Sequence, residues 1–128
     1  MIDVSILQSD GNWEYVFAYA DKPELVPGSN CDTSRFTRDD VSEIIALADG
    51  ENDGDNWLIV VKLKDGRVGF VSAGCDYTGW GCQESGSSKV ANTLEQMAIL
   101  GLSQDDRAKL KLAIDGAMGV ERVREIGS

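Results

Sequence analysis

The sequence predicts an α+β fold in which a small antiparallel sheet packs against three to four helices on one of its faces. Three observations predict it: a strand-like alternation over residues 13–20, a β-hairpin pattern over 57–73, and apolar residues at helical spacing elsewhere. A period of two is typical of a strand, whereas spacings of three and four indicate a helix. The 128 residues contain no repeat or linker, so we expect a single domain, residues 1–128.

The first predicted strand is residues 13–20, "WEYVFAYA", which carry an aromatic side chain at every second position. This alternation would place the rings on one face of the strand, against the core. Residues 21–36 contain both prolines of the chain and are predicted to form a loop.

A helix is predicted to begin at Thr37, whose hydroxyl can cap it, with Asp39 and Asp40 in the first turn near the positive end of the helix dipole. Asp49-Gly50 would end it. The apolar residues at helical spacing are Val41, Ile44, Ile45 and Ala48.

The clearest predicted element is a β-hairpin, in which "WLIVVKLK" (57–64) turns at Asp65-Gly66 and returns as "RVGFVSA" (67–73). Asp-Gly favours a two-residue type I′ turn. Such a turn would place the large apolar side chains together on one face of the sheet. The predicted pairs are Leu63 with Val68, Val61 with Phe70, and Ile59 with Ser72.

Residues 84–88, "ESGSS", are predicted to form a loop and the remaining chain to be helical. One helix would cover about 93–100 and end at Gly101. A second would be capped by Ser103 and end at Gly116. A short final helix over 120–126 has the weakest pattern.

The net charge of −10 lies entirely in residues 1–56, which carry 13 acidic and three basic residues. The segment from Asp39 to Asp55 contains seven carboxylates and no cation. This charge opposes binding to nucleic acids and anionic membranes, because phosphate binding requires Lys and Arg. It favours a protein partner of basic character. The alternative is that the charge serves solubility alone.

The absence of histidine excludes a Ser-His-Asp triad, a Cys-His dyad and a His-ligated metal centre. A catalytic cysteine needs an electropositive setting, which Asp76 beside Cys75 opposes. Cys31, Cys75 and Cys82 supply at most three of the four zinc ligands, at the wrong spacing. We therefore expect structural thiols, no cofactor and no recognisable catalytic constellation.

Residues 49–55, "DGENDGD", resemble the first half of a calcium-binding EF-hand loop. Asp49, Glu51 and Asp53 occupy its first three ligand positions, and a predicted helix precedes them. The position of the bidentate Glu is held by Val60, and a strand follows. A solvated acidic turn is the preferred interpretation, with these three residues as weak metal candidates.

The segment "GCDYTGWGCQ" (74–83) directly follows the predicted hairpin and combines an acid with two large aromatic residues. Aromatic anchors suit a protein-binding surface, and the glycines permit the sharp turns that would present them. The alternative is that Tyr77 and Trp80 pack inward. The predicted partner-binding residues are Asp76, Tyr77, Thr78, Trp80, Gln83, Asp53 and Asp55.

Residues 40–102 combine a helix pattern, an acidic turn similar to "EGENDG", a "W…LKDGR" hairpin and a "GCDYTGW-x-CQ" loop. In this the chain resembles a group of small acidic bacterial and phage proteins without an established activity. The resemblance covers about half of the chain and supports the fold prediction and the choice of loop. Many members carry Asp at the position of Gly81.

The function predicted from these patterns is that of a non-enzymatic binding protein, such as a phage-encoded or immunity-type inhibitor, that engages a protein partner. The alternatives are a small-molecule or calcium-binding domain, a carboxylate-based enzyme using the same loop, and a DNA-mimicking inhibitor. The chain has no long apolar run and no signal-peptide pattern, so a cytoplasmic location without membrane contact is expected.

Overall fold

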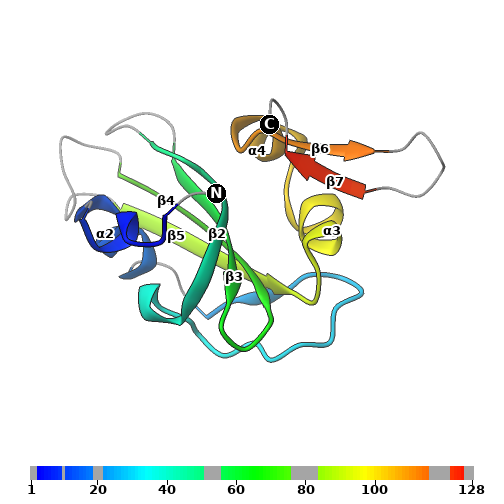
Figure 1. Ribbon diagram of the computed structural model, residues 1–128, viewed down its shortest axis with the longest axis horizontal. Helices are drawn as coiled ribbons and strands as arrows, with labels where there is room; N and C mark the ends of the chain where they lie inside the picture. Colours follow the sequence, from blue (N-terminus) through cyan, green and yellow to red (C-terminus); the bar gives the residue numbers. More distant parts are fainter. Residues whose placement is uncertain are drawn as a thin grey trace.

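The computed structural model describes residues 3–9, 11–18, 22–50, 56–75, 84–115 and 122–125. Its strands form a five-stranded mixed sheet and a separate two-stranded sheet (Figure 1). The helical elements are α1 (Ile6–Ser9), α2 (Gly11–Ala18), the 3-10 turn η1 (Arg38–Asp40), α3 (Leu94–Gln96), the π-helical turn η2 (Met97–Gly101) and α4 (Gln104–Lys109). The strands are β1 (Glu24–Leu25), β2 (Val41–Ala48), β3 (Trp57–Leu63), β4 (Val68–Cys75), β5 (Glu84–Ala91), β6 (Leu112–Asp115) and β7 (Arg122–Glu125).

The large sheet has the strand order β1-β5-β4-β3-β2, with β1 parallel to β5 and the other neighbours antiparallel. Strands β6 and β7 pair with each other. Figure 1 shows α2 on one side of the large sheet and α3, α4 and the β6–β7 pair on the other. Both faces of the sheet are therefore covered.

The predicted fold class, an antiparallel sheet packed against three to four helices, is wrong. The described residues form a mixed sheet with only four α-helices, the longest of eight residues. The sheet buries apolar side chains on both faces, so stretches that read as helices from their apolar spacing belong to strands. None of the helices in the described part of the chain is long and apolar enough to span a bilayer.

The strand predicted near residues 13–20 is also wrong, because Gly11–Ala18 form helix α2. Trp13, Val16 and Phe17 are buried, and their spacing of three and four makes one helical face. Tyr15 is 42% exposed, although strand alternation grouped it with Trp13 and Phe17. The aromatic residues fit both periods, and packing against the sheet selects the helix.

The helix predicted from Thr37 extends only to the single turn η1, after which Val41–Ala48 form strand β2. The pairing of β2 with β3 shifts register between Val41 and Glu43 and again between Ile44 and Ala46. A β-bulge adds a residue to one strand, so residues on one face are three apart instead of two. The buried Val41 and Ile44 belong to the same apolar cluster and show this spacing, which imitates a helix.

The predicted hairpin is confirmed as β3 and β4, but its register differs by one residue. Phe70 pairs with Val60 and not with Val61. The Gly66 N–H donates to Leu63 O at 2.9 Å, and Gly66 has a φ of 96°. This geometry is a three-residue loop with glycine in the left-handed conformation, the next commonest hairpin after the two-residue one. A shift of one residue moves each side chain of a strand to the opposite face.

The second half of the chain contains more strand than predicted. The expected loop at 84–88 belongs to β5, and the helix expected to continue to Gly116 ends at Lys109. The weak final helix over 120–126 is replaced by β7. The cap at Ser103 is confirmed, since its hydroxyl accepts a hydrogen bond from the Asp106 N–H at 3.1 Å.

Candidate functional site

The sequence predicts an acidic turn at residues 49–55 and a loop with two large aromatic residues at 74–83, called the aromatic loop below. Both follow strands that end at the same end of the large sheet. The acidic turn follows β2 and precedes β3, and the aromatic loop joins β4 to β5. At this end the paired residues are Ala48 with Leu58, Trp57 with Ala73, and Cys75 with Glu84. The hairpin turn at Gly66 lies at the opposite end. The ends of the four adjacent strands that flank the two segments in the sequence therefore lie together at one end of the sheet.

Asn56 connects the start of β3 to the end of β4. It is the last residue before β3, and its side-chain amide donates to Ser72 Oγ at 3.2 Å. Its side chain also occupies the space where a Cβ on Gly74 would lie. Glycine at position 74 therefore allows the end of the acidic turn to pack against the strand that leads into the aromatic loop.

The predicted partner-binding residues lie outside the described residues, so their role stays a prediction. The same is true of two of the three weak metal candidates, whereas the third, Asp49, is exposed directly after β2. The residues outside the description are Glu51, Asp53, Asp55, Asp76, Tyr77, Thr78, Trp80 and Gln83.

The helix predicted before residue 49, which partly favoured calcium binding, is wrong, because strand β2 occupies that position. An EF-hand loop joins two helices. The segment 49–55 instead joins strands β2 and β3. Within the described ranges, no group of three or more acidic or cysteine side chains has the geometry to hold a metal ion.

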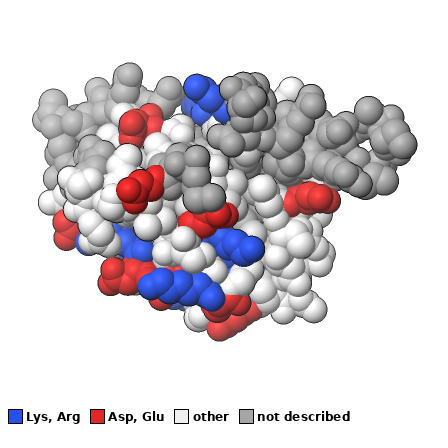
Figure 2. Space-filling view, viewed as in Figure 1, with Lys and Arg blue, Asp and Glu red and all other residues white. Residues whose placement is uncertain are grey.

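Charges of both signs meet at the opposite end of the sheet, where the hairpin turns. Glu43 pairs with Lys62 across β2 and β3, and the Lys64 N–H donates to Asp40 O at 2.8 Å. Figure 2 shows acidic and basic side chains next to one another over the lower half of the face in view. Glu43, in the first part of the acidic segment, therefore has a cation as its cross-strand neighbour.

The basic residues near the start of the acidic segment are engaged with the backbone. Arg35 Nη2 donates to the carbonyl oxygens of Phe17 and Ala18 at the end of α2, at 3.2 and 2.8 Å. Arg38 Nη1 donates to Leu7 O at 2.9 Å. A cation at a helix C-terminus is favourable because the carbonyl groups there carry partial negative charge.

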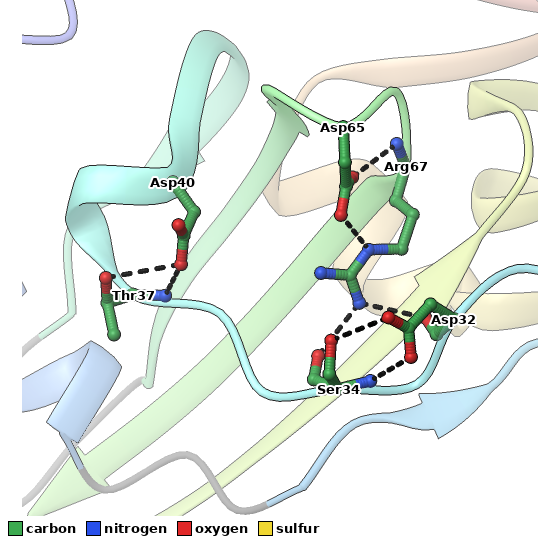
Figure 3. Close-up of polar contacts among 6 residues, drawn as sticks. All are labelled: Asp32, Ser34, Thr37, Asp40, Asp65 and Arg67. Carbon is green, nitrogen blue, oxygen red and sulfur yellow. Dashed lines mark hydrogen bonds and ion pairs between the residues drawn. The ribbon is translucent and has the colours of Figure 1, made fainter.

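Arg67 organises a second polar centre, at the hairpin turn (Figure 3). Arg67 is 7% exposed, and its Nε donates to the Asp65 carboxylate at 2.9 Å. Its Nη1 donates to the carbonyl oxygens of Asp32 and Ser34, both at 2.8 Å. The guanidinium carbon lies 6.0 Å from the centre of the Phe36 ring. These contacts fasten the 32–36 segment to the hairpin, and sequence reasoning missed them because the partners are more than 30 residues apart.

Asp32 is part of the same segment but faces solvent. Its carboxylate accepts hydrogen bonds from the Ser34 N–H at 2.9 Å and from the Ser34 hydroxyl at 3.0 Å. These bonds hold the pKa of Asp32 below its usual value, because they favour the charged form. Cys31 beside it is a free, half-buried thiol.

An open groove with a volume of about 650 Å³ lies on the face of the sheet beneath α3. The sequence did not indicate it, since its lining comes from four separate parts of the chain. The lining residues are Glu43, Ile44, Ile45, Lys62, Gly66, Val68, Asn92, Thr93 and Leu94.

Comparison with known proteins found no counterpart: no family model, curated protein or solved structure matches the chain. The resemblance to small bacterial and phage proteins stays a prediction.

Proposed function

We propose that this protein is a non-enzymatic binding module that engages a protein partner at the end of the sheet where the acidic turn and the aromatic loop originate. The observation that carries the proposal is that the strand ends flanking the two segments lie at one end of the sheet, where Asn56 contacts Ser72 and Gly74. Loops held by a rigid scaffold are the usual place for binding residues. A phage-encoded or immunity-type inhibitor would use such a surface.

The two segments have complementary roles in the proposal. Asp49, Asp53 and Asp55 steer a basic partner, because a field of one sign raises the rate of encounter. Tyr77 and Trp80 provide the contacts that hold it, since large rigid aromatic side chains lose little entropy on binding. The acidic turn thus governs association, and the aromatic loop governs dissociation.

The first test identifies the partner by affinity capture from the host and then compares purified variants by calorimetry. Trp80→Ala is expected to weaken binding by a factor of about 30 or more, as for a hot-spot residue, with an unchanged melting temperature. Leu100→Ala is the matched control, because Leu100 is 53% exposed and lies in η2. A large fall in melting temperature for Trp80→Ala would place this residue in the core and overturn its role as an anchor.

The second test separates steering from anchoring. The double variant Asp53→Asn, Asp55→Asn is expected to slow association about tenfold at low salt and to flatten its salt dependence. Glu24→Gln with Asp105→Asn removes the same charge from exposed positions in β1 and α4 and serves as the control. Equal effects of the two double variants would show that net charge alone matters and would contradict a role for the acidic turn.

A further inference from the structure

Strand β2 is an edge of the large sheet. It has eight residues, and among the described strands it pairs with β3 alone. An edge strand presents a row of N–H and C=O groups that can pair with another chain. It leads directly into the acidic turn at Asp49.

The shape and charge of this edge select the kind of chain that can pair with it. The two register shifts interrupt the first part of β2, and the regular part is Ala46–Ala48, next to the acidic turn. Bulges hinder a long, flat pairing between two copies of the same edge. A second copy would also bring another ten net negative charges to the same place. The occupant is therefore a basic segment of another protein.

The groove beside β2 indicates that the partner segment also carries apolar residues. It reaches the edge strand at Ile45 and continues across the sheet to Val68 and Leu94. Ile45 and Leu94 are half-buried and belong to the apolar cluster of this face. Alternate side chains of an added strand point to the same face, so they would lie over the groove. Asp49 at the strand end supplies an acidic contact, whereas Glu43 at the groove is paired with Lys62 across β2 and β3.

We propose that β2 binds a basic, extended segment of the partner by β-strand addition, with alternate apolar side chains over the groove at Ile45. The proposal rests on the proposed function and adds how the partner is held. In this mode main-chain hydrogen bonds supply affinity, and the side-chain sites supply selectivity.

The test uses an eight-residue peptide of alternating lysine and valine, with the same peptide N-methylated at every residue as the control. The methylated peptide keeps the charge and the side chains but has no N–H group to donate to the carbonyl groups of β2, whichever of its edges faces the strand. We expect the first peptide to shift the amide resonances of Ala46, Leu47 and Ala48, and the second to bind at least tenfold more weakly. Equal binding of the two peptides, or shifts confined to other residues, would overturn strand addition.

A variant tests whether the full partner binds at the same site as the peptide. Ile45→Lys places a cation at the groove and is expected to weaken both the peptide and the partner at least tenfold, whereas Leu100→Lys leaves both unchanged. If the partner depends on Trp80 and Asp53 but ignores Ile45→Lys, strand addition is wrong and the proposed function stands. If no protein partner responds to any of these variants, the proposed function itself fails. A dimer seen by sedimentation at micromolar concentration, and lost in the Ile45→Lys variant, would assign the edge to a second copy and overturn the proposal.

Discussion

At the scale of single residues, Arg67 shows how a charged side chain becomes part of the core. It is almost completely buried, its Nε donates to the Asp65 carboxylate, and its Nη1 donates to the backbone oxygens of Asp32 and Ser34. A buried charge is tolerated when it is paired and hydrogen-bonded, because desolvation is otherwise too costly. The adjacent Lys64 belongs to the same turn but is exposed. Residue type alone does not distinguish these two cations.

Replacing Arg67 with Met is expected to lower the free energy of unfolding by about 3 kcal/mol, because two carbonyl oxygens and a carboxylate lose their donor. Lys64→Met, the control in the same turn, should change stability by less than about 0.5 kcal/mol. Urea denaturation measures both. Similar values for the two variants would show that the Arg67 contacts contribute little to stability.

At the scale of elements, two local signals are confirmed, the position of the hairpin and the cap at Ser103, whereas the predicted two-residue turn, the helix capped by Thr37 and the periodic signals are wrong. The hairpin at Asp65-Gly66 and the cap at Ser103 depend on the conformation of a few adjacent residues. Helix α2 and strand β2 depend on which other element covers them, and their apolar spacing fits two structures. In β2 the bulges remove the period-two signal altogether.

Two glycines of the hairpin differ in why they are needed. Gly66 has a positive φ and no atom near the position of its missing Cβ, whereas a Cβ on Gly69 would lie 2.7 Å from Phe36 Cζ. Gly66→Ala should therefore cost about 1 kcal/mol through backbone strain. Gly69→Ala should cost about 2 kcal/mol or more, because the buried Phe36 ring must move.

A double-mutant cycle checks these two causes by urea denaturation. In a Phe36→Leu background the cost of Gly69→Ala should fall, whereas the cost of Gly66→Ala should not. A constant cost for Gly69→Ala in both backgrounds would contradict the steric origin assigned to it.

At the scale of the whole molecule, strand β3 contributes side chains to two apolar clusters, one on each face of the sheet. Ile59 and Val61 of β3 face the cluster that contains Trp13 and Phe17 of α2. Leu58 and Val60 of the same strand face the cluster that contains Met97 of η2, Leu102 and Leu110. The predicted one-sided core is wrong for this reason. Because either face can accept large side chains, the apolar pattern does not fix the hairpin register, and the three-residue loop sets it.

The two clusters predict similar losses of stability when either of two adjacent valines is replaced. Val60 and Val61 are both completely buried but face opposite clusters. Val60→Ala and Val61→Ala should each cost about 2 kcal/mol, the effect of two lost methyl groups and a cavity. Lys62→Ala, at the next and exposed position, is the control. Thermal or urea unfolding measures all three, and a near-zero value for either valine would show that one face is not a true core.

The sequence by itself determined the features that short-range chemistry controls. These are the position of the hairpin, the cap at Ser103, the absence of histidine chemistry and the acidic first half of the chain. Only the tertiary structure decided which apolar segments are strands and that both faces of the sheet are covered. It also decided that the strand ends flanking residues 49–55 and 76–83 lie at one end of the sheet. The physical reason is that burial depends on contacts between distant segments, and a local apolar pattern shows that a residue is buried but not what covers it.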